Sequence, residues 1–175
     1  MWKTFQPANL NPWILFSFDV DLGLFGQDPI GFYAHQLIIL WVVAGMTYHL
    51  LRPWVNPLWA AVGPVLFVCS APVTNSVYQL MTRHYLEGLL LSIFAFHCYL
   101  IALKKDRFAW ACLGALCYFC AAGAKEVYVV LPLMLFLIPM GGWRKRVAYA
   151  LPFFAVMGLY ALWRRYMLGT WVGGY

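Results

Sequence analysis

A lysine and a glutamate lie side by side in the middle of a long apolar segment. Within residues 108–143 the only charged residues are Lys125 and Glu126, with seventeen uncharged residues on each side. Each flank is close to the ~20 residues that a helix needs to cross a bilayer, and charges in a bilayer core are costly unless they face water. We therefore expect residues 123–126 to form the tip of a helical hairpin. Such a pair either marks a simple turn or forms a polar site at the membrane face.

Other charged and titratable residues are expected at the same face. The presence of basic residues at this face requires an explanation. One explanation is that they bind an anionic headgroup such as a lipid phosphate. The alternative is local pairing, of Arg83 with Glu87 four residues on, and of Lys125 with Glu126 or with an acid on a neighbouring helix. Interface anchoring is the alternative for Arg164 and Arg165. The expected lipid-phosphate residues are Arg83, Lys125, Arg164 and Arg165, and the expected supporting residues are His35, His84, Glu87 and Glu126.

The composition indicates an integral membrane protein. Of the 175 residues, 64% are hydrophobic, 19% aromatic and only 10% charged, and the mean hydropathy is +0.73. Soluble domains of this length are far more polar. The net charge is +6, but the basic residues cluster at the ends of apolar segments, as membrane orientation requires. We expect an all-α, polytopic protein in a lipid bilayer, with no nucleic-acid partner.

Six apolar segments are expected to cross the membrane. Prolines at positions 64, 132 and 152 fall inside them and predict kinks, because neighbouring helices can satisfy the carbonyl groups that a proline frees. The expected spans are residues 30–51, 57–73, 85–103, 108–123, 127–140 and 147–163.

The turns after the first, third and fifth spans are strongly basic. The positive-inside rule places these turns in the cytoplasm and both termini on the periplasmic or luminal side of a bacterial inner membrane or the endoplasmic reticulum. The turns hold seven basic residues against one acid, namely Arg52, Lys104, Lys105, Arg107, Arg144, Lys145 and Arg146 against Asp106.

The expected organisation has three parts. Residues 1–28 form an outer-face interfacial loop with a short helix near 12–24, residues 29–166 form the transmembrane bundle, and residues 167–175 begin another outer-face loop. Residues 1–11 lack the apolar core of a signal peptide. Because an outward N-terminus then needs an upstream helix, we expect a fragment or the ordered part of a longer protein.

Two cysteines have the spacing of a redox or metal pair. Cys117 and Cys120 form a C-x-x-C motif, but it lies inside an expected membrane helix without a matching histidine or second pair. Small packing residues are the better interpretation. The sequence shows no convincing set of metal ligands.

Several short motifs resemble, in order and spacing, those of GT-C membrane glycosyltransferases. The similarity is greatest to the protein O-mannosyltransferase and tetratricopeptide-linked transmembrane branches, whose first outer loop often contains "L-S-F … L-F-G-L-N-P-x-G-Y-H". The matching positions here are Leu15-Phe16-Ser17-Phe18, Leu24-Phe25-Gly26, Asp28-Pro29, Gly31-Phe32, Ala71-Pro72-Val73 with Arg83, Gly123-Ala124-Lys125-Glu126 with Leu131-Pro132, and Leu151-Pro152-Phe153 with Tyr160, Arg164 and Gly169.

This resemblance implies a GT-C-like partial bundle and a role in moving a sugar from a polyprenyl-phosphate donor. In such enzymes basic residues at the outer face hold the carrier phosphate. An acidic residue in the first outer loop serves as general base or metal ligand, so a divalent metal is a possible cofactor of a full-length enzyme. No other cofactor is implied.

The chain departs from the family pattern at its start. The first helix and the acidic motif that follows it are absent, and Asp21 matches a structural position of the loop. The remaining candidates for a catalytic acid are Asp19 and Asp21. The alternative to an enzyme is a non-catalytic membrane subunit with a GT-C-like fold that packs against other subunits of a larger complex.

Overall fold

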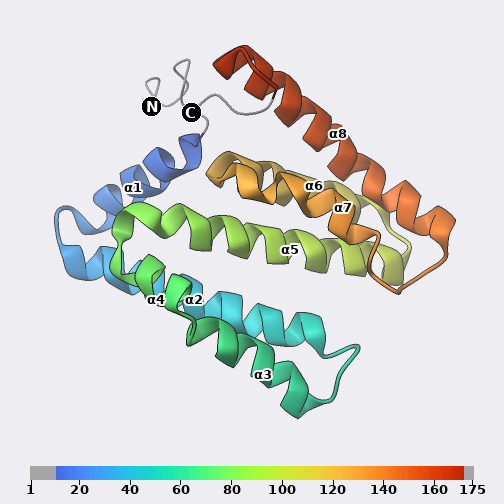
Figure 1. The fold of residues 1–175 in the computed structure, drawn as a ribbon, viewed down its shortest axis with the longest axis horizontal. Helices are drawn as coiled ribbons and strands as arrows, with labels where there is room; N and C mark the ends of the chain where they lie inside the picture. Colours follow the sequence, from blue (N-terminus) through green and yellow to red (C-terminus); the bar gives the residue numbers. More distant parts are fainter. Residues whose placement is uncertain (1–10, 172–175) are drawn as a thin grey trace.

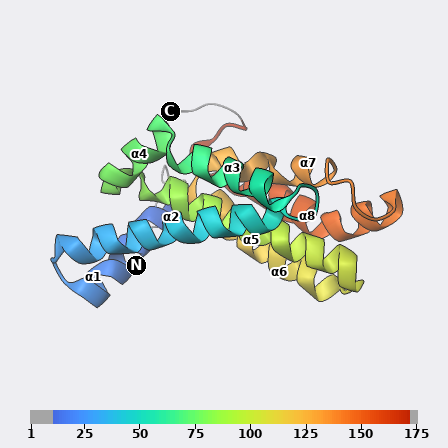
Figure 2. The same ribbon diagram turned by 90° about the horizontal axis from the view of Figure 1, so that it is seen from below.

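The computed structural model describes residues 11–171, in which all regular elements are helical. Helix α5 runs through the middle of the molecule, with α2 and α3 on one side and α6, α7 and α8 on the other (Figure 1). The views from two directions place α1 and α4 at the same end of the bundle (Figure 2). The elements are α1 (Pro12–Phe25), α2 (Pro29–Leu51), α3 (Pro57–Val68), α4 (Ala71–Tyr78), η2 (Leu80–Thr82), α5 (Arg83–Lys105), α6 (Phe108–Ala124), η3 (Glu126–Val130), α7 (Leu131–Leu135) and α8 (Trp143–Leu168).

Three described helices are long and apolar enough to cross a membrane, or up to four if the bent pair α3 and α4 is one span. The three are α2, α8 and the continuous Leu80–Lys105 segment that contains α5. Helices α3 and α4 meet at 54°, and α6 and the Glu126–Leu135 segment are apolar but shorter. These helices support the expectation of an all-α membrane protein, whereas six full-length spans are not confirmed.

The expected fifth span, residues 127–140, departs most from a regular helix. It consists of the 3-10 turn η3 and the five-residue helix α7, followed by turns. Pro132 lies at the start of α7, where its missing N–H group is tolerated, and Gly141 adopts a φ of +73°. Because Pro132 has no N–H group to donate to the preceding turn, a regular α-helix does not run through η3 and α7.

Helices α2 and α3 begin at caps that are visible in the sequence. The side chain of Asp28 accepts a hydrogen bond from the backbone N of Ile30 at 3.0 Å, and Asn56 accepts one from Trp59 at 3.0 Å. In both cases a proline follows the cap as the first helical residue. The side-chain cap satisfies a free N–H group of the first turn, and the proline fixes its own φ angle at a helical value.

The core lies where α5, α6 and α8 meet. Tyr99, Tyr118 and Phe153 are fully buried there, and the ring of Phe153 is 5.9 Å from that of Tyr99, edge to face. A Cβ atom added at Gly114 would lie 2.7 Å from Cζ of Phe153 and 3.0 Å from the carbonyl oxygen of Ala95. Glycine at this position therefore lets α6 approach its neighbours closely, as small residues do between membrane helices.

Asp106 is the C-cap of α5 at one end of the bundle and adopts a φ of +54°. Its carboxylate accepts hydrogen bonds from Oη of Tyr149 at 2.6 Å and from Nζ of Lys145 at 2.9 Å. The hydrogen bond from Tyr149 and the charge and hydrogen bond of Lys145 lower the pKa of Asp106 below its ordinary value. Because both partners belong to α8, this contact ties the end of α5 to the start of α8.

We expect Asp106 to titrate below its ordinary pKa of 3.8. The folded-state pKa is depressed, so the stabilising contribution is present above the unfolded pKa and is lost as the pH falls through the folded pKa. A ¹³C NMR titration of the carboxyl carbon in micelles measures this directly. Tyr149→Phe should move the midpoint back toward 3.8, while Tyr166→Phe, at an exposed position of the same helix, should not. A wild-type midpoint at or above 3.8 would refute the prediction.

Candidate functional site

Charged residues gather at two opposite ends of the bundle. We call the end formed by α1, the start of α5 and the end of α6 the polar end, and the end around Asp106 the basic end. At the polar end Arg83 pairs with Asp21, and Arg164 pairs with Glu126. Most of the expected site residues therefore lie at one end, brought there from α1, α2, α5, α8 and the segment after α6.

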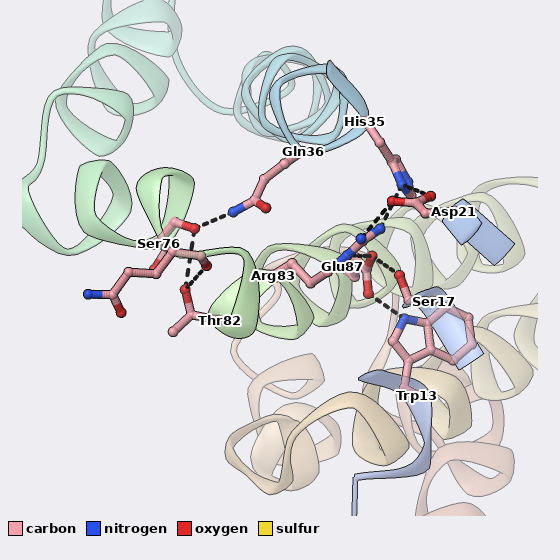
Figure 3. A network of polar contacts seen from close by, with 10 residues as sticks. Trp13, Ser17, Asp21, His35, Gln36, Ser76, Thr82, Arg83 and Glu87 are labelled. Atoms are coloured by element: carbon pink, nitrogen blue, oxygen red, sulfur yellow. Dashed lines mark hydrogen bonds and ion pairs between the residues drawn. The ribbon is translucent and has the colours of Figure 1, made fainter. Parts of the chain in front are cut away.

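Arg83 is the centre of the polar end. Its Nη1 atom donates to Oδ2 of Asp21 at 2.6 Å, and its Nε atom donates to Oε1 of Glu87 at 3.0 Å (Figure 3). The guanidinium group also lies over the ring of Phe18, with Cζ 4.9 Å from the ring centroid. The side chains of Arg83 and Asp21 are 1% and 0% exposed, so this is a buried ion pair.

Three side chains on one face of helix α1 contact this cluster. Trp13, Ser17 and Asp21 are four residues apart, which places them on the same side of the helix. Nε1 of Trp13 donates to Oε2 of Glu87 at 2.9 Å, and the hydroxyl of Ser17 donates to its Oε1. Sequence reasoning missed Trp13 and Ser17, although their spacing from Asp21 was a usable signal. The expected helix near residues 12–24 is present as α1, packed onto α2, α5 and α6.

His35 has two competing partners. Its Nδ1 atom lies 2.7 Å from Oδ1 of Asp21 and 2.7 Å from Nη2 of Arg83. The carboxylate requires a proton on Nδ1, whereas the guanidinium requires a lone pair there. Because His35 is the only described donor to this oxygen of the buried Asp21, we assign the proton to Nδ1. The carboxylate of Asp21 therefore fixes the orientation of this half-buried imidazole.

A second polar contact adjoins the Arg83 cluster through α4 and η2. The side-chain amide of Gln36 donates to the carbonyl oxygen of Ser76, which also accepts from the hydroxyl of Thr82 at 3.3 Å (Figure 3). This joins α2 to the segment before α5. Sequence reasoning did not select Gln36 because a single buried amide has no sequence signature.

The turn after α6 carries the other expected site residues. Helix α6 ends at Ala124, as the expected hairpin tip required, and Glu126 pairs with Arg164 of α8 instead of with Lys125. Nζ of Lys125 lies 5.4 Å from the ring centroid of Tyr85, in a cation–π contact. The hydroxyl of Tyr128 donates to the carbonyl oxygen of Tyr85 at 2.5 Å, which holds η3 against the start of α5.

The remaining candidates are divided between surface and interior. Asp19 and Arg165 are exposed, whereas His84 is buried with 8% of its surface exposed. Asp21 is inaccessible behind Arg83 and His35. In this arrangement neither expected acid combines exposure with a position inside the cluster.

Arg83 therefore has the local pairing that was the alternative to phosphate binding. Its Nε and Nη1 atoms donate to Glu87 and Asp21, and its Nη2 atom lies next to the ring of His35. The expected binding of a lipid phosphate by Arg83 would require this side chain to leave these partners. Within residues 11–171 no group of three or more His, Cys, Asp or Glu side chains is placed to hold a metal ion.

Comparisons with known proteins add no relative: no family model, curated protein or solved structure matches the chain.

Proposed function

We propose that the chain is part of a GT-C-type membrane glycosyltransferase that uses a polyprenyl-phosphate-linked sugar donor. The observation that carries the proposal is the assembly of polar side chains, including Lys125 and Arg164, at one end of an apolar helical bundle. The motif resemblance associates these two positions with the carrier phosphate. Cations near a membrane surface stabilise a leaving phosphate, which is the main electrostatic requirement of such a transfer.

An apolar cavity below the polar end supports a lipid carrier. It has a volume of about 240 Å³ and lies between α2, α5 and the η3–α7 segment. Its lining includes Leu89 and Phe96 of α5 and Val127 and Met134 of the facing segment. Leu89 follows Tyr85 by one helical turn, so the cavity begins next to the Lys125 contact. An isoprenoid chain has the chemistry that such a surface accepts.

We also propose that the chain crosses the membrane six times, with the basic end in the cytoplasm and both termini on the periplasmic or luminal side of a bacterial inner membrane or the endoplasmic reticulum. Contacts at the two ends support this arrangement, because Asp106 meets Lys145 at one end while Glu126 meets Arg164 at the other. Helices α6 and α8 must then run in the same direction. Helix α6 and the η3–α7 segment are shorter than a full span. Crossing at these segments therefore requires a locally thinner bilayer near the polar end.

The second candidate is a non-catalytic subunit with a GT-C-like fold in a larger membrane complex. One observation favours it: Asp21 is fully buried and ion-paired with Arg83, so it is not placed to remove a proton from an acceptor.

The test uses the 175-residue chain in lipid nanodiscs with a benzophenone-bearing farnesyl-phosphate-linked hexose. We expect photo-crosslinks to residues around the Tyr85–Lys125 contact, removed by competing undecaprenyl phosphate but not by farnesol. We expect no sugar transfer by this chain, because base assistance, typically worth ~10²–10⁴-fold, is lacking. Labelling spread evenly over lipid-facing helices would reject donor binding. Transfer that Asp21→Asn abolishes would instead make Asp21 the base.

A further inference from the structure

We propose that the basic end binds the headgroups of anionic phospholipids, with Lys104, Arg107 and Arg144 as the principal contacts. This site lies at the end of the bundle opposite the Tyr85–Lys125 contact, so it is independent of the proposed donor binding. The distribution of charge, the contacts of each basic side chain and the neighbouring aromatic residues support it.

The basic end carries the whole net charge of the chain. The α2–α3 turn, the α5–α6 turn and the turn before α8 come together there (Figures 1 and 2). These turns and the helix ends beside them hold seven basic residues and one acid, Asp106, which give this end a formal charge of +6, equal to that of the whole chain. The remaining five basic and five acidic residues cancel. A charge excess of this kind attracts anions to one end of the molecule only.

Four of these seven basic side chains have a partner within the described residues. Lys145 pairs with Asp106, and Arg146 donates to two backbone carbonyl oxygens of the segment before α8. The ammonium group of Lys105 lies over an indole ring, and Arg52 donates to a carbonyl oxygen of its own turn. These four side chains are therefore engaged in holding the turns and helix ends together.

Lys104, Arg107 and Arg144 are exposed, and within residues 11–171 none of them lies within ion-pair distance of a carboxylate. The only acid at this end already accepts hydrogen bonds from a lysine and a tyrosine of α8. The Asp106–Lys145 pair also brings Arg107 and Arg144 close together, since each is the chain neighbour of one partner. The repulsion between these like charges falls when an anion binds among them.

Exposed apolar and aromatic side chains favour a lipid over a soluble anion as the partner. The candidate membrane span Leu80–Lys105 ends at this end of the bundle, and the span Trp143–Leu168 begins there. Trp143 is 60% exposed and Phe108 is 52% exposed. Tryptophan is enriched where a membrane meets water, and basic clusters at that level recognise anionic headgroups. A phospholipid offers an anionic group next to apolar chains, which matches cations that adjoin exposed apolar helices.

The test measures the binding of phosphatidylglycerol and phosphatidylcholine with identical acyl chains to the 175-residue chain, by native mass spectrometry from a neutral detergent. We expect the wild-type chain to bind phosphatidylglycerol more tightly. Lys104→Gln, Arg107→Gln and Arg144→Gln should each weaken phosphatidylglycerol binding about fivefold, the equivalent of ~1 kcal/mol per basic residue at an anionic surface, and leave phosphatidylcholine binding unchanged. The triple variant should lose most of the preference for phosphatidylglycerol.

Arg165→Gln is the matched control, because it removes one exposed basic residue at the polar end and lowers the net charge by the same amount as each single variant. Its affinity for phosphatidylglycerol should equal that of wild type. All four positions are exposed, so the thermal unfolding midpoints should not change, and weaker binding then reflects a lost contact and not a damaged fold.

Equal wild-type affinity for the two lipids would overturn the proposal, and so would a preference that the triple variant retains. An equal loss of affinity in Arg165→Gln would show attraction by net charge alone and would also overturn it. Soluble glycerol 3-phosphate at matched ionic strength should not displace phosphatidylglycerol, and displacement would contradict a lipid as the occupant. Added salt should weaken the binding of phosphatidylglycerol but not that of phosphatidylcholine, because salt screens exposed charges.

Discussion

Replacement of Arg83 with methionine is expected to destabilise the folded chain by about 3–5 kcal/mol, because removal of one partner of a buried ion pair leaves an uncompensated charge. Here two carboxylates, Asp21 and Glu87, would remain in the same buried site. Contacts of Asp21 with Arg83 connect α1 to α5, so α1 should separate first. The measurement is equilibrium unfolding in mixed micelles, followed by circular dichroism, with the fluorescence of a single retained Trp13 reporting on α1.

The matched control for this variant is Arg165→Met, an exposed arginine on α8. Its free energy of unfolding should remain within about 0.5 kcal/mol of wild type, as for other surface substitutions. A triple variant, Arg83→Met with Asp21→Asn and Glu87→Gln, should recover part of the loss because no buried charge remains. A change below about 1 kcal/mol for Arg83→Met alone would show that the cluster is not a buried ion-pair network in the folded protein.

Cysteines at positions 79 and 107 are expected to react with an impermeant maleimide from opposite sides of the membrane. Gln79 is exposed at the polar end, just before α5, and Arg107 is exposed at the other end of the same helix. The intervening Leu80–Lys105 segment is 26 residues long and apolar, so it is long enough to span a bilayer of ~30 Å. In sealed, oriented vesicles each position should therefore react with reagent on one side of the membrane and not with reagent on the other.

The labelling experiment needs a background in which the five native cysteines are replaced by alanine. Two further positions serve as internal controls: Gly123→Cys should report the same side as position 79, and Gly142→Cys the same side as position 107. Labelling of both position 79 and position 107 from a single side would contradict the proposed orientation. Opposite labelling with position 107 outside would invert it.

Helical structure, membrane class and several boundaries follow from local features of this chain. The caps Asp28 and Asn56, each followed by proline, define where α2 and α3 begin, because they act through backbone groups only two or three residues away. The end of α6 near Lys125 was expected because two adjacent charges do not belong inside an apolar helix. The possible pairing of Arg83 with Glu87 was visible from their spacing of four residues.

The lengths of the membrane segments were less accessible from sequence. Apolar composition extends over residues 127–140, but the backbone there forms a 3-10 turn, a short helix and turns. Hydropathy records how favourably side chains leave water. It does not record whether proline and glycine interrupt the hydrogen-bond ladder or whether neighbouring helices stabilise the resulting bends.

The choice of partners at the polar end depended on the tertiary structure alone. Glu126 could pair with adjacent Lys125 or with a distant cation, and the packing of α8 brings Arg164 to it. Asp21 reaches Arg83, 62 positions later in the chain, only because α1 folds back across α2 and α5. Ion pairs form between whichever opposite charges the packed helices bring within about 4 Å, and that distance is set by burial of apolar faces far from the charges themselves.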